Sequence, residues 1–165
     1  MRNSFFRLFL IIITAIISFN LIEFTDSDFV IAFLLFIGLV LNYKTTENTY
    51  DTFSNYFFWI IMFLLITILK KISFTALLDS FLILLVLKVF VLLYNYIKYK
   101  NVSVTSLYLS KIWIFTFFLY QVEIILNSTH GFKSLCFFLG LISIIETFLI
   151  IFRNKEWKFS VVSFW

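Results

Sequence analysis

Residues 74–96 read FTALLDSFLILLVLKVFVLLYNY, a stretch in which Asp79 and Lys88 are the charged residues. A helix of ~20 mainly apolar residues is long enough to cross the hydrocarbon core of a bilayer, so this stretch predicts a transmembrane helix. The chain contains no Pro. Its absence suggests straight helices rather than the interrupted helices that carry ion sites in many transporters.

The composition extends this prediction to the whole chain. Hydrophobic residues make up 62% of the 165 residues and charged residues 13%, against about half and about a quarter in soluble domains. We therefore expect an all-α integral membrane protein, a bundle of about six transmembrane helices in one domain spanning residues 1–165. Several apolar segments are shorter than ~20 residues, so five spans remain an alternative. The expected helices are Phe5–Phe19, Phe29–Tyr43, Tyr56–Leu69, Phe74–Tyr96, Ile112–Leu126 and Ser134–Phe152.

The basic residues predict an orientation with both termini in the cytoplasm, because positive charges favour the inner side of a membrane. On this topology the basic residues at inner helix ends outnumber those at outer ends. The inner set is Arg2, Arg7, Lys44, Lys98, Lys100, Lys111, Arg153, Lys155 and Lys158, and the outer set is Lys70, Lys71 and Lys133. We interpret the net charge of +4 as a topology signal and expect no nucleic-acid partner. The first segment is expected to be a retained anchor, since no small-residue cleavage site follows it.

Charged residues inside the predicted spans are functional candidates, because a charge in the bilayer costs several kcal/mol unless it is paired or hydrated. Asp79 and Lys88 are nine residues apart, which places them on opposite helix faces. Lys88 and Glu146 fall at a similar predicted depth, so we expect an ion pair between them. Asp79 and Glu123 lie near the predicted outer ends, where they are expected to reach water.

Cys136 and His130 are the single cysteine and histidine of the chain. One cysteine excludes an internal disulfide and any multi-cysteine metal site. No third residue is evident that would orient the pair, so we interpret their proximity in sequence as chance rather than as a nucleophile and its base.

Asp51 and Asn55 are four residues apart at the start of a predicted helix and so share one helix face. Two oxygen-bearing side chains placed in this way could hold a divalent metal or a polar headgroup. Asp and Asn are also ordinary residues at helix starts, which is the structural alternative.

The pattern Glu47-x3-Asp51-x3-Asn55 opens a helix, Lys88 lies within the following one, and Ser110-Lys111 opens the next. In these features the chain resembles the CDP-alcohol phosphotransferases (CDP-alcohol phosphatidyltransferases), six-helix membrane enzymes of phospholipid synthesis. The resemblance covers about residues 47 to 155 and implies a lipid-headgroup site with Mg or Mn as metal. Asp51, Asn55, Lys88 and Lys111 would line that site near the cytoplasmic face, with the lysines facing phosphate.

The upstream half of the family signature, D-x2-D-G-x2-A-R, is missing. Its expected window falls in Val30–Gly38, which is apolar, and Asn55 stands where the family has an acidic residue. An amide can ligate a metal but supplies no negative charge and no base. The resemblance therefore predicts a catalytically inactive or strongly altered relative, and Mg or Mn matters only if activity is retained.

A non-enzymatic membrane protein is the competing hypothesis. The segment Phe24–Tyr50 is similar to the membrane start of organelle-encoded ATP synthase b-type subunits, although the chain continues into further apolar segments. An accessory subunit of a respiratory or ATP synthase complex, or a small immunity-type protein, would use its buried charges to set helix register. Expected partners are membrane lipids and either a second copy or a subunit of a membrane complex.

Overall fold

The computed structural model describes residues 2–19, 27–43, 49–71, 74–100, 108–128 and 130–156. Over these residues the chain is all-helical. The helices are α1 Arg2–Ser18, α2 Ser27–Tyr43, α3 Thr49–Leu69, α4 Phe74–Tyr99, α5 Tyr108–Ile125 and α6 Phe132–Arg153. Each of the six expected segments coincides with one helix. Several helices extend beyond the apolar run, and α3 begins at Thr49 rather than Tyr56, because polar residues can continue a helix past the hydrocarbon region.

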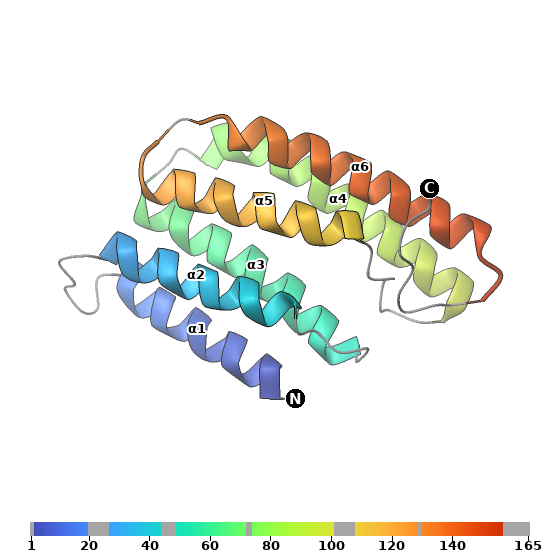
Figure 1. Ribbon diagram of the computed structural model, residues 1–165, viewed down its shortest axis with the longest axis horizontal. Helices are drawn as coiled ribbons and strands as arrows, with labels where there is room; N and C mark the ends of the chain where they lie inside the picture. The colour runs from blue at the N-terminus through green and yellow to red at the C-terminus, as the bar shows by residue number, and fades with distance from the viewer. Residues whose placement is uncertain are drawn as a thin grey trace.

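The helices run in alternating directions, and the start of α1 lies at the same end of the bundle as the end of α6 (Figure 1). α1 packs against α2 and α3, while α4 packs against α6. α5 lies between these groups and contacts α2, α3 and α6. α5 is therefore the helix that joins the two halves of the fold.

Three helical segments in the described part are long and apolar enough to cross a membrane: Phe81–Tyr99, Tyr108–Ile125 and Phe132–Arg153. The apolar segments Ser4–Ser18, Ser27–Asn42 and Ser54–Leu69 are shorter. α1 and α2 have 17 residues each, or about 26 Å at 1.5 Å per residue, against a hydrocarbon core of ~30 Å. Helix length and composition over the described residues therefore support three membrane spans and not the six we expected.

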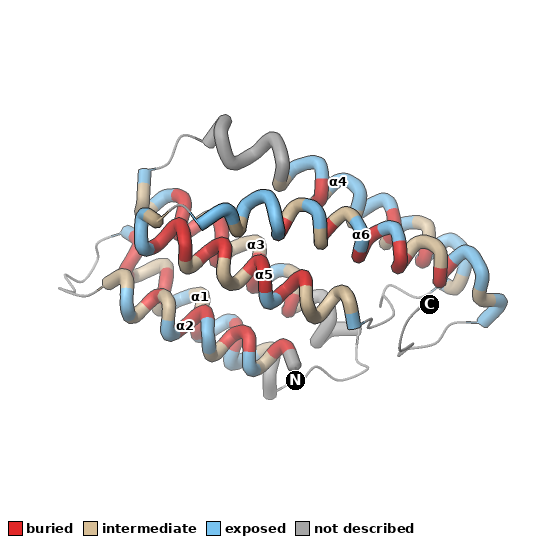
Figure 2. Tube along the Cα trace, turned by 45° about the horizontal axis from the view of Figure 1, so that its top comes forward, coloured by how far each residue is buried: buried red, intermediate tan, exposed pale blue. Residues whose placement is uncertain are grey.

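Large apolar side chains cover the outer surface of the bundle. Phe29 is 79% exposed and Phe138 is 62% exposed, and exposed residues follow the outer faces of α4 and α6 (Figure 2). Phe58, Met62 and Ile66 of α3 are fully buried inside. An exterior of this kind is costly in water and matches the hydrocarbon of a bilayer.

Phe117 of α5 is the centre of an aromatic cluster that joins three helices. Its ring centroid lies 5.5 Å from Phe81 of α4 and 5.7 Å and 6.0 Å from Phe63 and Trp59 of α3. Trp113, one turn earlier in α5, stacks on it at 5.9 Å. Each such pair contributes about 0.5–1.5 kcal/mol beyond its buried area, so this cluster fixes α3 and α4 against α5.

Glu123 caps the start of α6. We expected this residue to reach water, but it is buried. Its carboxylate accepts hydrogen bonds from the backbone N–H groups of His130, Gly131 (2.9 Å) and Phe132 (3.1 Å). The first N–H groups of a helix have no partner within it, and the helix dipole favours negative charge there. Gly131 offers no side chain and has φ +84°, so the cap comes from α5 instead.

Glu123→Ala should destabilise the protein by about 2–3 kcal/mol, because buried N–H groups lose a charged acceptor. Glu123→Gln should cost less, since one amide oxygen can still accept. Thermal unfolding in detergent measures both. Glu156→Ala removes an exposed carboxylate and is the matched control. Equal unfolding temperatures for Glu123→Ala and Glu156→Ala would contradict the capping role.

Candidate functional site

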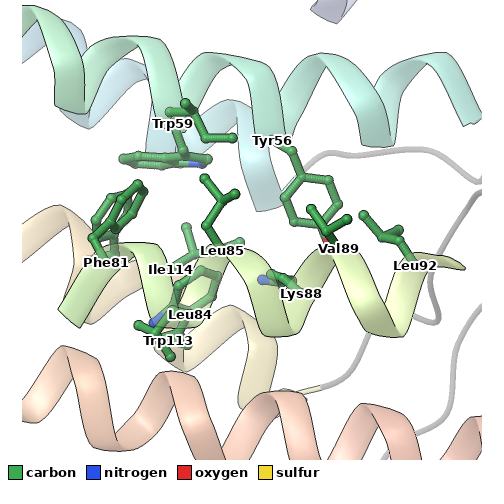
Figure 3. Close-up of a pocket in the computed structure, with 12 residues that line it drawn as sticks. Tyr56, Trp59, Phe81, Leu84, Leu85, Lys88, Val89, Leu92, Trp113 and Ile114 are labelled. Atoms are coloured by element: carbon green, nitrogen blue, oxygen red, sulfur yellow. The ribbon is translucent and has the colours of Figure 1, made fainter. Parts of the chain in front are cut away.

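A cavity of about 90 Å³ lies between α3, α4 and α5 (Figure 3). Tyr56 and Trp59 of α3 form one wall, and Trp113 and Ile114 of α5 form another. The wall from α4 consists of Phe81, Leu84, Leu85, Lys88, Val89 and Leu92. These residues recur at three- and four-residue spacing, which places them on one helix face. Lys88 is the charged residue in an otherwise almost wholly apolar lining.

The Lys88 ammonium lies over aromatic rings. Its Nζ atom is 3.6 Å from the ring centroid of Trp113 and 4.9 Å from that of Tyr56. Cation–π contacts contribute about 0.5–2 kcal/mol, less than the several kcal/mol that a charge in an apolar medium costs. The rings therefore offset only part of the cost of placing Lys88 here.

The expected ion pair between Lys88 and Glu146 is not formed in this structure. Both side chains are described, and no salt bridge joins them. Glu146 is buried in α6 and has a contact elsewhere in the chain. Similar depth in the bundle did not bring the two groups together, because rotation about each helix axis also decides which way a side chain points.

Trp113 is held in place by α6. Its indole N–H donates a hydrogen bond of 3.1 Å to the carbonyl oxygen of Cys136. Gly140 leaves room for the ring, since a β-carbon there would lie 2.7 Å from the indole nitrogen. The position of the ring beneath Lys88 therefore depends on a residue without a side chain on the neighbouring helix.

A second, smaller cavity of about 10 Å³ adjoins the first. Tyr56 and Lys88 line both cavities. Ser110 of α5 and Thr147 of α6 bring hydroxyl groups to the smaller one. The Oγ atoms of Ser110 and Ser143 are 3.0 Å apart, and the Thr147 hydroxyl donates to the carbonyl oxygen of Ser143 at 2.7 Å. Lys88 therefore lies where a wholly apolar part of the cavity wall meets a space that hydroxyl groups line in part.

The described side chains of the predicted site lie in different surroundings. The Asn55 amide is buried and donates a 2.5 Å hydrogen bond to Oδ1 of Asn42 on α2. Neither Asn55 nor Lys111 lines the two cavities that contain Lys88. Asp51 belongs to the first turn of α3, but its side chain, like that of Asp79, lies outside the described residues. Of the four predicted residues, the structure places Lys88 in a cavity.

Arg7 is a buried residue that sequence analysis counted only as a topology charge. It is 1% exposed, and its guanidinium donates to the Ser54 hydroxyl at 3.0 Å and to the Leu41 carbonyl at 3.2 Å. The carbonyl belongs to the last turn of α2, where basic groups are favourable. Arg7 thereby ties α1 to α2 and α3. The sequence did contain a sign of this burial, because Arg7 lies within the first apolar segment and not before it.

The described residues around Asn55 do not fit a Mg or Mn site. They offer an amide from Asn42, a hydroxyl from Ser54 and the guanidinium of Arg7. Such ions bind through carboxylate oxygens, and a guanidinium repels a cation. Across the described part of the chain, no group of three His, Cys, Asp or Glu residues is placed to hold a metal ion.

Comparison of the chain with protein-family models, with curated proteins and with solved structures finds no match. The resemblance to CDP-alcohol phosphotransferases therefore stays a prediction from the residues quoted above. The geometry of the cavity is the basis on which a function can be argued.

Gly140→Ala should displace the Trp113 ring and weaken the protein by about 1–3 kcal/mol, the usual cost of overpacking. Thermal unfolding in detergent checks the loss. The double variant Gly140→Ala with Trp113→Phe should recover much of it, because the smaller ring leaves space for the methyl group. A double variant that is less stable by the sum of the two single effects would contradict direct contact.

Proposed function

We propose that this chain is an integral membrane protein that binds an amphiphile in the cavity between α3, α4 and α5. The alkyl part occupies the apolar space and the polar end meets Lys88. One observation carries the proposal, namely that the Lys88 ammonium lines an apolar cavity and contacts rings rather than a carboxylate of the described chain. A ligand with a complementary polar end would offset the cost that the rings leave.

Membrane insertion of the whole bundle is part of this proposal. Two of the three shorter apolar helices, α2 and α3, pack directly on α5, and α1 packs on both of them. We propose that all six helices cross the membrane, the shorter ones through a locally thinned bilayer. The start of α1 and the end of α6 lie at one end of the bundle (Figure 1), as an even number of spans requires, and the basic residues favour the cytoplasm for that end.

A phosphotransferase relative remains the alternative suggested by sequence. It shares a lipid ligand at Lys88 with our proposal but adds metal-assisted displacement at a phosphate. The described oxygen donors near Asn55 do not support that chemistry, and we expect no release of CMP from CDP-diacylglycerol with Mg or Mn. Such release by the purified protein would favour the alternative.

Filling the cavity should block binding. In phosphatidylcholine nanodiscs, a fatty alcohol and a fatty acid with a diazirine in the chain are offered to the purified protein. Labelled positions are mapped by mass spectrometry. We expect labels on the cavity faces of α3 and α4, and a several-fold loss in Leu85→Trp because an indole takes up the space.

Leu82→Trp is the matched control, since Leu82 lies on the same helix but is 44% exposed on the outside. It should label like the unchanged protein. Equal labelling of Leu85→Trp and Leu82→Trp with both probes would refute binding in this cavity.

A further inference from the structure

The chemical class of the ligand can be inferred from the two cavities that meet at Lys88, given the proposed amphiphile site. The larger cavity is apolar, while the smaller one carries the hydroxyls of Ser110 and Thr147. Lys88 and Tyr56 line both. A bound amphiphile that satisfies both surroundings places its chain in the larger cavity and its polar group against the smaller one.

The direction of the ligand follows from the helices. Ser110 lies in the first turn of α5 and Thr147 in the second half of α6, toward the end of the bundle where α1 starts and α6 ends (Figure 1). At the opposite end of the larger cavity, Phe81 stacks on Phe117 at 5.5 Å and on Phe63 at 4.5 Å. The polar group therefore faces the end where α1 starts, and the chain points toward the stacked rings.

The volume limits the ligand to one chain. The larger cavity measures about 90 Å³, below the ~150 Å³ of an engineered apolar cavity that takes up benzene. Part of one alkyl chain fits this space, but the two chains of a phospholipid do not. The smaller cavity, about 10 Å³, is near the minimum for one water molecule, which favours a small head over a bulky one.

The charge and hydrogen-bond donors favour an acidic head. Lys88 contributes a cation, and the Tyr56 hydroxyl has no hydrogen-bond partner among the residues the structure describes. In the hydrogen bond between Ser110 and Ser143, either hydroxyl can be the donor. When Ser143 donates, the O–H group of Ser110 is available to donate to a ligand. The nearby Lys98 is already used, because its ammonium donates to the carbonyl oxygens of Ile151 and Phe152 at the end of α6.

We infer that the site takes a single-chain amphiphile with a carboxylate head, a fatty acid. The carboxylate lies at Lys88 with the Tyr56 and Ser110 hydroxyls as further donors, and the alkyl chain lies along Leu84 and Leu85 toward Phe81. Charge-assisted hydrogen bonds to a carboxylate are about twice as strong as neutral ones. The site therefore distinguishes ligands mainly by their head group. The alkyl part is recognised only by its length and by the number of chains.

Competition between ligands of equal chain length tests the inference. The full-length protein in phosphatidylcholine nanodiscs is labelled with the diazirine fatty alcohol, and unlabelled acid, alcohol, methyl ester and monoalkyl phosphate compete. We expect the acid to compete at a concentration at least tenfold lower than the alcohol or the ester. Lys88→Met should remove this preference while labelling at the cavity persists. Lys155→Met removes an exposed lysine that lines neither cavity and should keep the preference.

Tyr56→Phe is a second variant that takes away one hydroxyl and leaves the ring over Lys88. It should reduce the preference for the acid over the alcohol several-fold without changing thermal stability. This variant tests the inference even if Lys88→Met does not fold. Equal competition by acid and alcohol, or an unchanged preference in both Lys88→Met and Tyr56→Phe, would overturn the inference while the labelled cavity still stands. Tenfold stronger competition by the alkyl phosphate would overturn the carboxylate assignment. Absence of cavity labelling with every probe would instead remove the proposed function itself.

Discussion

The stacked rings around Phe117 are the interaction on which the position of α4, and with it the cavity, depends. In the Phe81–Tyr99 segment of α4, 17% of the residues are buried, against 50% in the Tyr108–Ile125 segment. α4 is thus packed along one narrow face, chiefly against α6. Phe81 stacks on Phe117 and Phe63 at one end, and Lys98 and Tyr99 bond to the end of α6 at the other. Between these fixed ends, the middle of α4 can face an open space without separating from the bundle.

Three charged side chains of the described residues share one kind of contact, which Lys88 lacks. Arg7 donates to a hydroxyl and a carbonyl, Glu123 accepts from the start of a helix, and Lys98 donates to the end of one. Each uses backbone groups that a helix end leaves unpaired. Lys88 lies in the middle of α4, where the helix offers no such group. Its contacts are the faces of Tyr56 and Trp113. These rings offset only part of the cost of its charge, so Lys88 is the residue at which a ligand would add most.

The helices could be predicted from the sequence because apolar runs are long and end at polar clusters. Their ends could not, since polar first turns such as Thr49 to Asn55 continue a helix as readily as they precede it. Membrane span count was also uncertain, because α1 and α2 fall below the length that a bilayer needs. Within the site, Lys88 could be identified from sequence, because a charged side chain in an apolar segment costs free energy whatever surrounds it.

Its surroundings could not be identified in the same way. Depth suggested Glu146 as the partner of Lys88, and helix-face spacing suggested Asn55 as a neighbour, but neither fixes how two helices are rotated toward each other. That rotation is set by packing, and here by a small residue. Gly140 admits the Trp113 ring against α6, the indole N–H then reaches the Cys136 carbonyl, and the ring face comes to lie under the Lys88 ammonium. A β-carbon at position 140 would meet both the indole of Trp113 and the side chain of Leu84, two residues of the cavity wall. That wall therefore depends on the absence of one methyl group on α6, a helix that contributes no lining residue to the larger cavity.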